Sequence, residues 1–154
     1  MLFISFISTS QESIGSIHPE MHRIVGANIG NYLKKEPNLE IFFQRLKDHG
    51  KEIFIITNSP FHFVNVGMSY LLGPDWRDLF DVVVASAKKP AFFTDSMRPF
   101  RELDTKERVQ SWGPVHSLQK GKIYLEASCC LFEASGCYYV GVKRTCKVGD
   151  VTFC

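Results

Sequence analysis

Two short apolar runs, each preceded by a helical pattern, constrain the fold of this chain more than any other feature. Residues 53–56 are all apolar, and residues 80–85 read FDVVVA, which is rich in β-branched side chains. Such runs suit strands that are buried on both faces, as in a parallel sheet covered by helices. Residues 37–50 and 63–72 instead place apolar side chains at helical spacing, and a glycine ends or follows each segment. This alternation of helix and strand predicts an α/β fold with a parallel sheet.

The composition excludes several other classes of protein. The chain has 154 residues, of which 45% are hydrophobic and 22% are charged, as in an ordinary globular domain. Its formal net charge of +2 is too small to indicate a broad surface for nucleic acid or anionic lipid. No segment reaches the roughly 18–20 consecutive apolar residues that a membrane-spanning helix needs. We therefore expect no nucleic-acid partner and no membrane partner.

The cysteines are confined to the end of the chain. They are Cys129, Cys130, Cys137, Cys146 and Cys154. An odd number clustered in this way fits neither a secreted disulfide scaffold nor the paired spacing of a zinc site, so we interpret them as reduced thiols. The sequence changes character near Leu125. We therefore divide the chain into residues 1–124 and a divergent Cys-rich segment, residues 125–154.

The first seven residues, MLFISFI, are apolar. They lack the basic region of a signal peptide, and the STSQES that follows offers no good cleavage site. A buried strand and an unstructured start both remain open for this segment. Residues 1–13 also contain no basic residue of the kind expected in a mitochondrial transit peptide.

Polar side chains follow both predicted strands. Thr57 and Asn58 follow the first strand, and Lys88 and Lys89 follow the second. Ligands of α/β sheets bind at the carboxyl ends of the strands, where Thr57 and Asn58 can donate hydrogen bonds to phosphate oxygens and Lys89 can neutralise their charge. From spacing alone an alternative stays open, in which Thr57 and Asn58 are turn or cap residues and the lysines are solvated.

The remaining acidic residues indicate structure rather than chemistry. Asp75, Asp78 and Asp81 surround Trp76, and we expect them to cap a helix and lead into the second strand. Residues 91–114 are mixed in period and rich in turn formers, which predicts an excursion or a small hairpin at the sheet edge.

Four segments carry a resemblance to a known family. GKEIFIITNSPFHFVNVGMSYLLG, DWRDLFDVVVASAKKPAFF, RPFRELD and LQKGKIY resemble, in this order, successive blocks of the cytosolic purine 5'-nucleotidase and 5'-nucleotidase domain-containing family of the haloacid dehalogenase superfamily. They lie within residues 39–124. The resemblance implies a haloacid dehalogenase-like (Rossmannoid) three-layer sandwich with a parallel sheet.

The family activity that the resemblance implies is a magnesium-dependent hydrolysis of nucleoside 5'-monophosphates through an aspartyl phosphate. Thr57 falls on the phosphate-binding hydroxyl of the second superfamily motif, and Asn58 follows it as in the family. Lys89 falls on the lysine of the third motif, which gives it a catalytic role in stabilising the phosphoryl group. Relatives are cytosolic or mitochondrial, so the absence of a transit-peptide pattern favours the cytoplasm.

Two motifs of the superfamily are not found. No D-x-D pair occurs before Thr57, and the apolar start is followed by Ser8, Thr9 and Ser10. At the expected place of the fourth motif, YYVG is followed by Val142 and Lys143, which leaves Asp150 as the candidate metal ligand. Magnesium prefers carboxylate oxygens, so we expect this chain neither to bind Mg²⁺ nor to turn over substrate. The strands bearing these motifs are neighbours in the middle of the family's sheet, so we expect an incomplete fold with unpaired strand edges.

The sequence and the resemblance together lead to two hypotheses about function, which belong to different classes. The first is a partial 5'-nucleotidase-type hydrolase that is catalytically incompetent. The second is a non-catalytic interaction or regulatory module that binds a full-length relative by edge pairing or by competing for its oligomer interface. Aromatic side chains could give such a module a sticky surface, the alternative being an ordinary core: Phe42, Phe43, Phe61, Phe63, Phe92 and Phe93.

Overall fold

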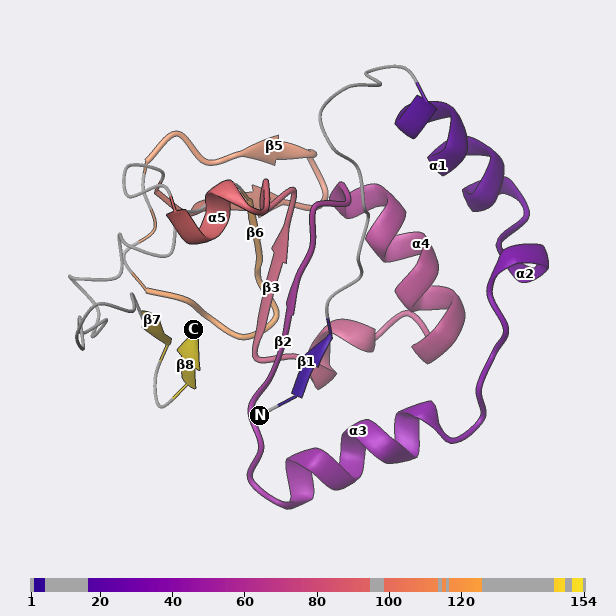
Figure 1. Ribbon diagram of the computed structural model, residues 1–154, viewed down its shortest axis with the longest axis horizontal. Helices are drawn as coiled ribbons and strands as arrows, with labels where there is room; N and C mark the ends of the chain where they lie inside the picture. The colour runs from indigo at the N-terminus through magenta and orange to yellow at the C-terminus, as the bar shows by residue number, and fades with distance from the viewer. Residues whose placement is uncertain are drawn as a thin grey trace.

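The computed structural model describes residues 2–4, 17–94, 99–113, 115, 117–125, 146–148 and 151–153 (Figure 1). Its elements, in chain order, are β1 (Leu2–Ile4), α1 (Ile17–Ala27), α2 (Ile29–Tyr32), α3 (Leu39–Asp48), β2 (Ile53–Ile56), α4 (Phe61–Leu72), the 3₁₀ helix η1 (Trp76–Leu79), β3 (Val82–Ala85), α5 (Ala91–Thr94), β4 (Arg101–Asp104), β5 (Val109–Gln110), β6 (Ile123–Leu125), β7 (Cys146–Val148) and β8 (Val151–Phe153). The helices and strands expected between residues 37 and 85 are therefore confirmed. None of the described helices is long and apolar enough to cross a membrane.

The main sheet has six strands in the order β1-β2-β3-β6-β4-β5. Strands β1, β2, β3 and β6 are parallel neighbours, whereas β4 pairs antiparallel with β6 and β5 pairs antiparallel with β4. The α/β class is confirmed. The expected parallel sheet forms the core, and the hairpin expected after Pro90 is formed by β4 and β5, which add an antiparallel end to it. Strands β7 and β8 form a separate antiparallel pair.

The apolar start of the chain is a strand of the main sheet. Leu2 is the register partner of Ile53, and Ile4 is the partner of Ile55, with β1 parallel to β2. The strand alternative for this segment is therefore the one observed. The unpaired edge that we expected is therefore that of β1, which covers β2 and is the outer strand among the described residues.

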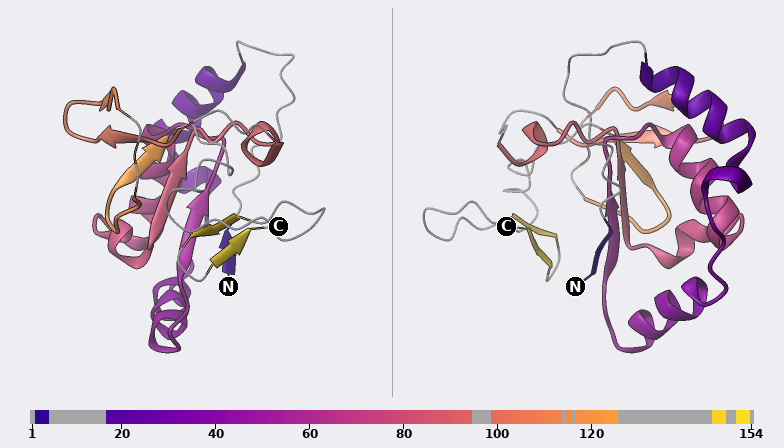
Figure 2. Two further views of the ribbon diagram at one scale, coloured as in Figure 1. Left: turned by 90° about the vertical axis from the view of Figure 1, so that its left-hand side faces the viewer. Right: turned by 45° about the vertical axis from the view of Figure 1, so that its right-hand side comes forward.

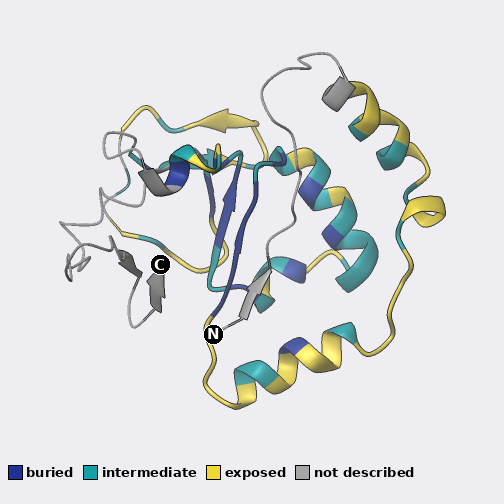
Figure 3. Ribbon diagram, viewed as in Figure 1, coloured by how far each residue is buried: buried dark blue, intermediate teal, exposed yellow. Residues whose placement is uncertain are grey.

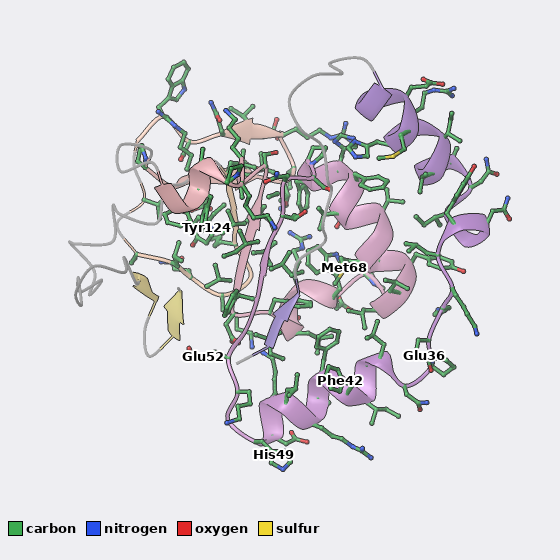
Figure 4. The ribbon with its side chains drawn as sticks, in the orientation of Figure 1. Glu36, Phe42, His49, Glu52, Met68 and Tyr124 are labelled. Atoms are coloured by element: carbon green, nitrogen blue, oxygen red, sulfur yellow. The ribbon has the colours of Figure 1, made fainter. Side chains whose placement is uncertain are left out.

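Both faces of the sheet carry a buried apolar cluster. On β2, Ile53 and Ile55 belong to the cluster that also holds Met68 of α4, whereas Phe54 and Ile56 belong to the cluster that holds Tyr124 of β6. Met68 and Tyr124 accordingly lie on opposite sides of β2 and β3 (Figure 4). Burial is deepest along β2 and β3 (Figure 3). These two strands are therefore buried on both faces, as their continuous apolar runs require.

The helices divide between the two faces. Figure 2 shows α3 and α4 on one side of β2 and β3, with α5 on the other. On the first side α3 contributes Phe43 and α4 contributes Val64 to the core, and on the second side α5 contributes Phe92. Helices α1 and α2 pack on α4 instead of on the sheet. The α3, α4 and α5 positions give the layered arrangement expected of a haloacid dehalogenase-like domain.

The acidic residues around Trp76 lead into β3 as expected, but the side chain of Asp75 makes no hydrogen bond that caps η1. Asp75 precedes η1, which leads into β3. The backbone N–H of Ile53 donates to Asp81 Oδ2 at 2.8 Å, and the N–H of Asp81 donates to the Ile53 carbonyl at 2.7 Å. Lys47 Nζ lies 3.5 Å from Asp81 Oδ1. Asp81 thus ties the start of β3 to the start of β2 and to α3.

Two of the six aromatic residues are buried in the core. Phe43 and Phe92 are buried, Phe61 and Phe63 are half-buried, and Phe42 of α3 is 44% exposed. The side chain of Phe93 lies outside the described residues. The core alternative is therefore correct for the two buried phenylalanines, and the solvent-facing ring is that of Phe42 (Figure 4).

Candidate functional site

The turns after β2 and β3 meet at one edge of the sheet. The two strands are parallel, so their carboxyl ends lie side by side, next to the starts of α4 and α5 at the top of Figure 1. The backbone N–H of Thr57 donates to the Val84 carbonyl, and the N–H of Ala87 donates to the Thr57 carbonyl, each at 2.9 Å. These bonds continue the strand pairing beyond β2 and hold the two turns together.

Asn58 connects the two turns through its side chain. Asn58 Nδ2 donates to the Lys89 carbonyl at 3.0 Å, and the Lys89 backbone N–H donates to Asn58 Oδ1 at 2.6 Å. One amide group therefore satisfies both backbone groups of a residue 31 positions away. This geometry fixes the place where the Lys89 side chain leaves the backbone.

Lys89 reaches back towards β2. Its Nζ donates to the carbonyl of Ile56, the last residue of β2, at 3.1 Å. Burial lowers the pKa of the Lys89 ammonium from its ordinary value, because a partly desolvated site disfavours the charged form. A cationic group is thus positioned at the carboxyl end of β2, beside Thr57 and Asn58.

The Thr57 hydroxyl is part of the turn itself. Thr57 is fully buried, and its Oγ1 accepts a hydrogen bond from the backbone N–H of Ser59 at 3.1 Å. Both Thr57 and Asn58 therefore make the turn contacts that the simpler interpretation expects of them. Their phosphate-binding role stays a prediction, as does the catalytic role of Lys89.

A match to a protein-family model shows which family the chain belongs to. This family model describes the 5' nucleotidase family and matches residues 3–150, from β1 onwards. The chain belongs to the 5'-nucleotidase family. The match extends beyond residues 39–124, in which the resemblance was found, and includes both the apolar start and most of the Cys-rich segment. The division at Leu125 stays a prediction.

Individual members of the 5'-nucleotidase family agree with this assignment. The chain is 43% identical over 119 residues to human 5'-nucleotidase domain-containing protein 2, an alignment covering 76% of this chain and 23% of that protein. It is 34% identical over 125 residues to a 5'-nucleotidase domain-containing protein of Dictyostelium discoideum, covering 75% of this chain and 21% of that protein. It is 35% identical over 108 residues to human 5'-nucleotidase domain-containing protein 1, and this alignment covers 68% of this chain and 23% of that protein. The chain thus spans less than a quarter of the length of these relatives.

The expectation that this chain does not bind Mg²⁺ stays a prediction. Mg²⁺ prefers oxygen ligands from carboxylates, together with phosphate and water. Within the described ranges, no group of three or more His, Cys, Asp or Glu side chains is placed to hold a metal ion. Asp150 lies outside those ranges. We derive no chemical step through a metal ion.

Sequence reasoning found the residues of this edge but missed how one of them acts. We expected Asn58 to donate to a phosphate oxygen, whereas its amide is bonded to the backbone of Lys89. No local sequence signal marks this pair, because the two residues are far apart along the chain. Only the parallel pairing of β2 with β3 brings them together.

Replacing Asn58 by alanine is expected to release Lys89 while leaving the sheet folded. The change leaves two part-buried backbone groups of Lys89 without these partners, which costs about 1–3 kcal/mol of unfolding free energy. Urea unfolding followed by circular dichroism measures the loss. Asn65→Ala is the control, because it removes an amide of α4 that accepts a hydrogen bond from Trp76 and not from Lys89. If the amide resonances of residues 87–89 and 91 shift equally in both variants, the positioning role of Asn58 is wrong.

Proposed function

We propose that this chain binds the phosphate group of a nucleoside 5'-monophosphate at the carboxyl ends of β2 and β3 and does not hydrolyse it. The cytoplasm is the compartment that we expect. One observation carries the proposal, namely that Asn58 and Lys89 join the two turns and set the ammonium group of Lys89 beside Ile56 and Thr57. This matches the positions on which the family resemblance puts its phosphate-binding residues.

The charge at this edge supports phosphate binding. Lys89 is a cation whose Nζ lies at the end of β2. Helix α4 begins at Phe61, shortly after Thr57, and has no acidic residue in its first turn. The free N–H groups at a helix start attract anions, so a phosphate near Thr57 experiences both the lysine and the helix.

The sequence supports the absence of hydrolysis. The only aspartate before Thr57 is Asp48. Asp48 ends α3, close to the start of β2, whereas the candidate site lies at the other end of that strand. The four residues of β2 alone separate the two by roughly 10 Å, so the Asp48 carboxylate does not reach a phosphorus atom beside Lys89. An aspartyl phosphate therefore has no nucleophile from this part of the chain.

A paired assay tests both halves of the proposal. The purified chain is incubated with purine nucleoside 5'-monophosphates and MgCl₂, and released phosphate is measured together with the ³¹P resonance of the nucleotide. We expect release at the background rate and a broadened, protein-dependent ³¹P signal. Robust magnesium-dependent release would show that the chain is an active hydrolase, and an unperturbed ³¹P signal would remove the binding claim.

The interaction module remains a second candidate because of one exposed aromatic residue. Trp112 follows β5 and is 93% exposed, and Val109 of β5 is 55% exposed. Exposed tryptophans are frequent anchors of protein interfaces. Co-purification of the tagged chain with a full-length 5'-nucleotidase relative, reduced by Trp112→Ala, would support this function. A chain that elutes as a monomer in the presence of that relative would argue against it.

A further inference from the structure

A cavity of about 220 Å³ lies between α4 and the helical pair α1 and α2. Val25 of α1 and Ile29 of α2 line one side, and Phe63, Val64 and Met68 of α4 line the other. Figure 1 shows α1 and α2 running along the outer side of α4, away from the sheet. Helix α4 forms the inner wall of the cavity, and the lining includes Ser59 from the turn after β2 but neither Thr57 nor Lys89.

Two glycines face side chains of neighbouring elements beside this cavity. A Cβ atom added to Gly67 of α4 would lie 3.7 Å from Leu33 Cδ1, and one added to Gly30 of α2 would lie 3.3 Å from Tyr70 Oη. Both neighbouring atoms belong to side chains, and 3.7 Å is an ordinary van der Waals contact, so a Cβ atom at Gly67 fits without a clash. Because Gly67 lines the cavity, a long side chain at this position would occupy it.

One hydroxyl interrupts the apolar lining on the side near the candidate phosphate site. Ser59 lines the cavity and is 6% exposed, whereas Tyr32, the other hydroxyl-bearing residue of the lining, is 56% exposed. The backbone of Ser59 is used by the turn, since its N–H donates to Thr57 Oγ1 and its carbonyl accepts from the Ser86 N–H. Within the part of the chain that the structure describes, the Ser59 hydroxyl makes no hydrogen bond.

The volume and lining of the cavity indicate which kind of molecule it can bind. The cavity is partly open to solvent beside Tyr32, so a ligand that enters it displaces water from a largely apolar wall. Apolar cavities of about 150 Å³ hold a benzene ring, so about 220 Å³ suits two fused rings. The Phe63 ring and the Met68 sulfur favour an aromatic guest over an aliphatic one. Small-molecule sites commonly combine such an apolar wall with one polar group that fixes orientation.

We propose that this cavity binds a planar aromatic molecule of two fused rings whose N–H donates to the Ser59 hydroxyl. The site does not depend on the proposed phosphate binding, because its lining includes neither Asn58 nor Lys89. It shares only the turn residue Ser59 with that region. Ligand and phosphate are therefore expected to bind at the same time.

Titration of the ¹⁵N-labelled chain with indole tests the site. We expect shifts at the amides of Leu33, Ser59 and Gly67, with a dissociation constant on the order of 0.1–1 mM for a ligand of this size. Gly67→Met should fill the cavity and weaken binding at least tenfold. Gly26→Met is the matched control, since a Cβ at Gly26 of α1 meets no atom within 4 Å and that residue does not line the cavity. Equal indole binding by the two variants would overturn the proposal.

A second comparison isolates the hydroxyl and remains informative if Gly67→Met does not fold. Indene has the shape of indole but no N–H group. Ser59→Ala should weaken indole about 2- to 10-fold and leave indene binding unchanged, because it removes one hydrogen-bond acceptor. Equal losses for both ligands, or no loss for either, would overturn the role of Ser59. Displacement of indole by inorganic phosphate would put the ligand at the other site and also overturn the proposal.

Discussion

The Trp76→Ala variant is expected to lose about 3–5 kcal/mol of unfolding free energy, the range for deleting a large buried aromatic side chain. Trp76 is the first residue of η1, and its side chain is fully buried in the larger apolar cluster, which also includes residues of α3 and α4. Its ring meets Phe80 edge to face at 5.9 Å, and its Nε1 donates to Asn65 Oδ1 at 3.1 Å. Alanine therefore leaves a cavity and removes the donor to a part-buried amide. Urea unfolding followed by far-ultraviolet circular dichroism measures the loss.

The second tryptophan of the chain provides the control. Trp112 is 93% exposed, and the hydrogen bond that Arg101 donates there goes to its backbone carbonyl. Trp112→Ala should change the unfolding free energy by no more than about 0.5 kcal/mol, as is usual for exposed positions. A comparable loss in both variants would show that burial of Trp76 is not what stabilises this side of the sheet.

The Lys89→Met variant is expected to weaken binding of a nucleoside 5'-monophosphate by about 10- to 100-fold. Methionine retains much of the apolar stem but removes the ammonium group, and a hydrogen bond to a charged group contributes about 1.5–3 kcal/mol. The ³¹P titration measures the affinity. Lys51→Met is the control, because Lys51 is exposed and precedes β2 at the opposite end of the strand. If both variants bind as the unchanged chain does, the phosphate does not lie beside Lys89.

The pH dependence of this binding follows from the lowered pKa of Lys89. Phosphate binding needs the protonated amine, so affinity should fall as pH rises through the folded-state pKa, below the usual range for lysine. The effect on stability has the opposite direction. Because burial disfavours the charged form, protonated Lys89 opposes folding at lower pH, and stability should rise as pH passes from the folded-state to the unfolded-state pKa. Lys89→Met should remove both dependences.

The local pattern of apolar residues and glycines was sufficient to predict the central helices and strands. The apolar run of residues 53–56 became β2, and the β-branched run became β3, because strands buried on both faces need continuous apolar sequence. Gly50 and Gly73, which follow α3 and α4, have φ angles of +66° and +88°. Glycine adopts this backbone region without a steric cost, so the two glycines were sufficient to predict where both helices end.

The pairing of strands that lie far apart in the sequence could not be predicted in the same way. The three residues of β1 pair with β2 across about fifty positions, and β4 joins β6 in the antiparallel direction. Neither pairing has a local signal, since partner choice depends on which strand edge remains free after the central strands assemble. For the same reason the sequence predicted a phosphate contact for Asn58 but not the hydrogen bonds of its amide to the backbone of Lys89.

The amino-acid sequence by itself determined the family, the α/β class and the polar residues that follow β2 and β3, because each of these is written in contiguous segments. The tertiary structure alone decided which groups touch. Parallel packing of β2 and β3 put the Asn58 amide on the Lys89 backbone, and the packing of α1 and α2 on α4 left a cavity with the Ser59 hydroxyl in its wall. Contacts of this kind depend on the distances between elements, which no single segment of the chain encodes.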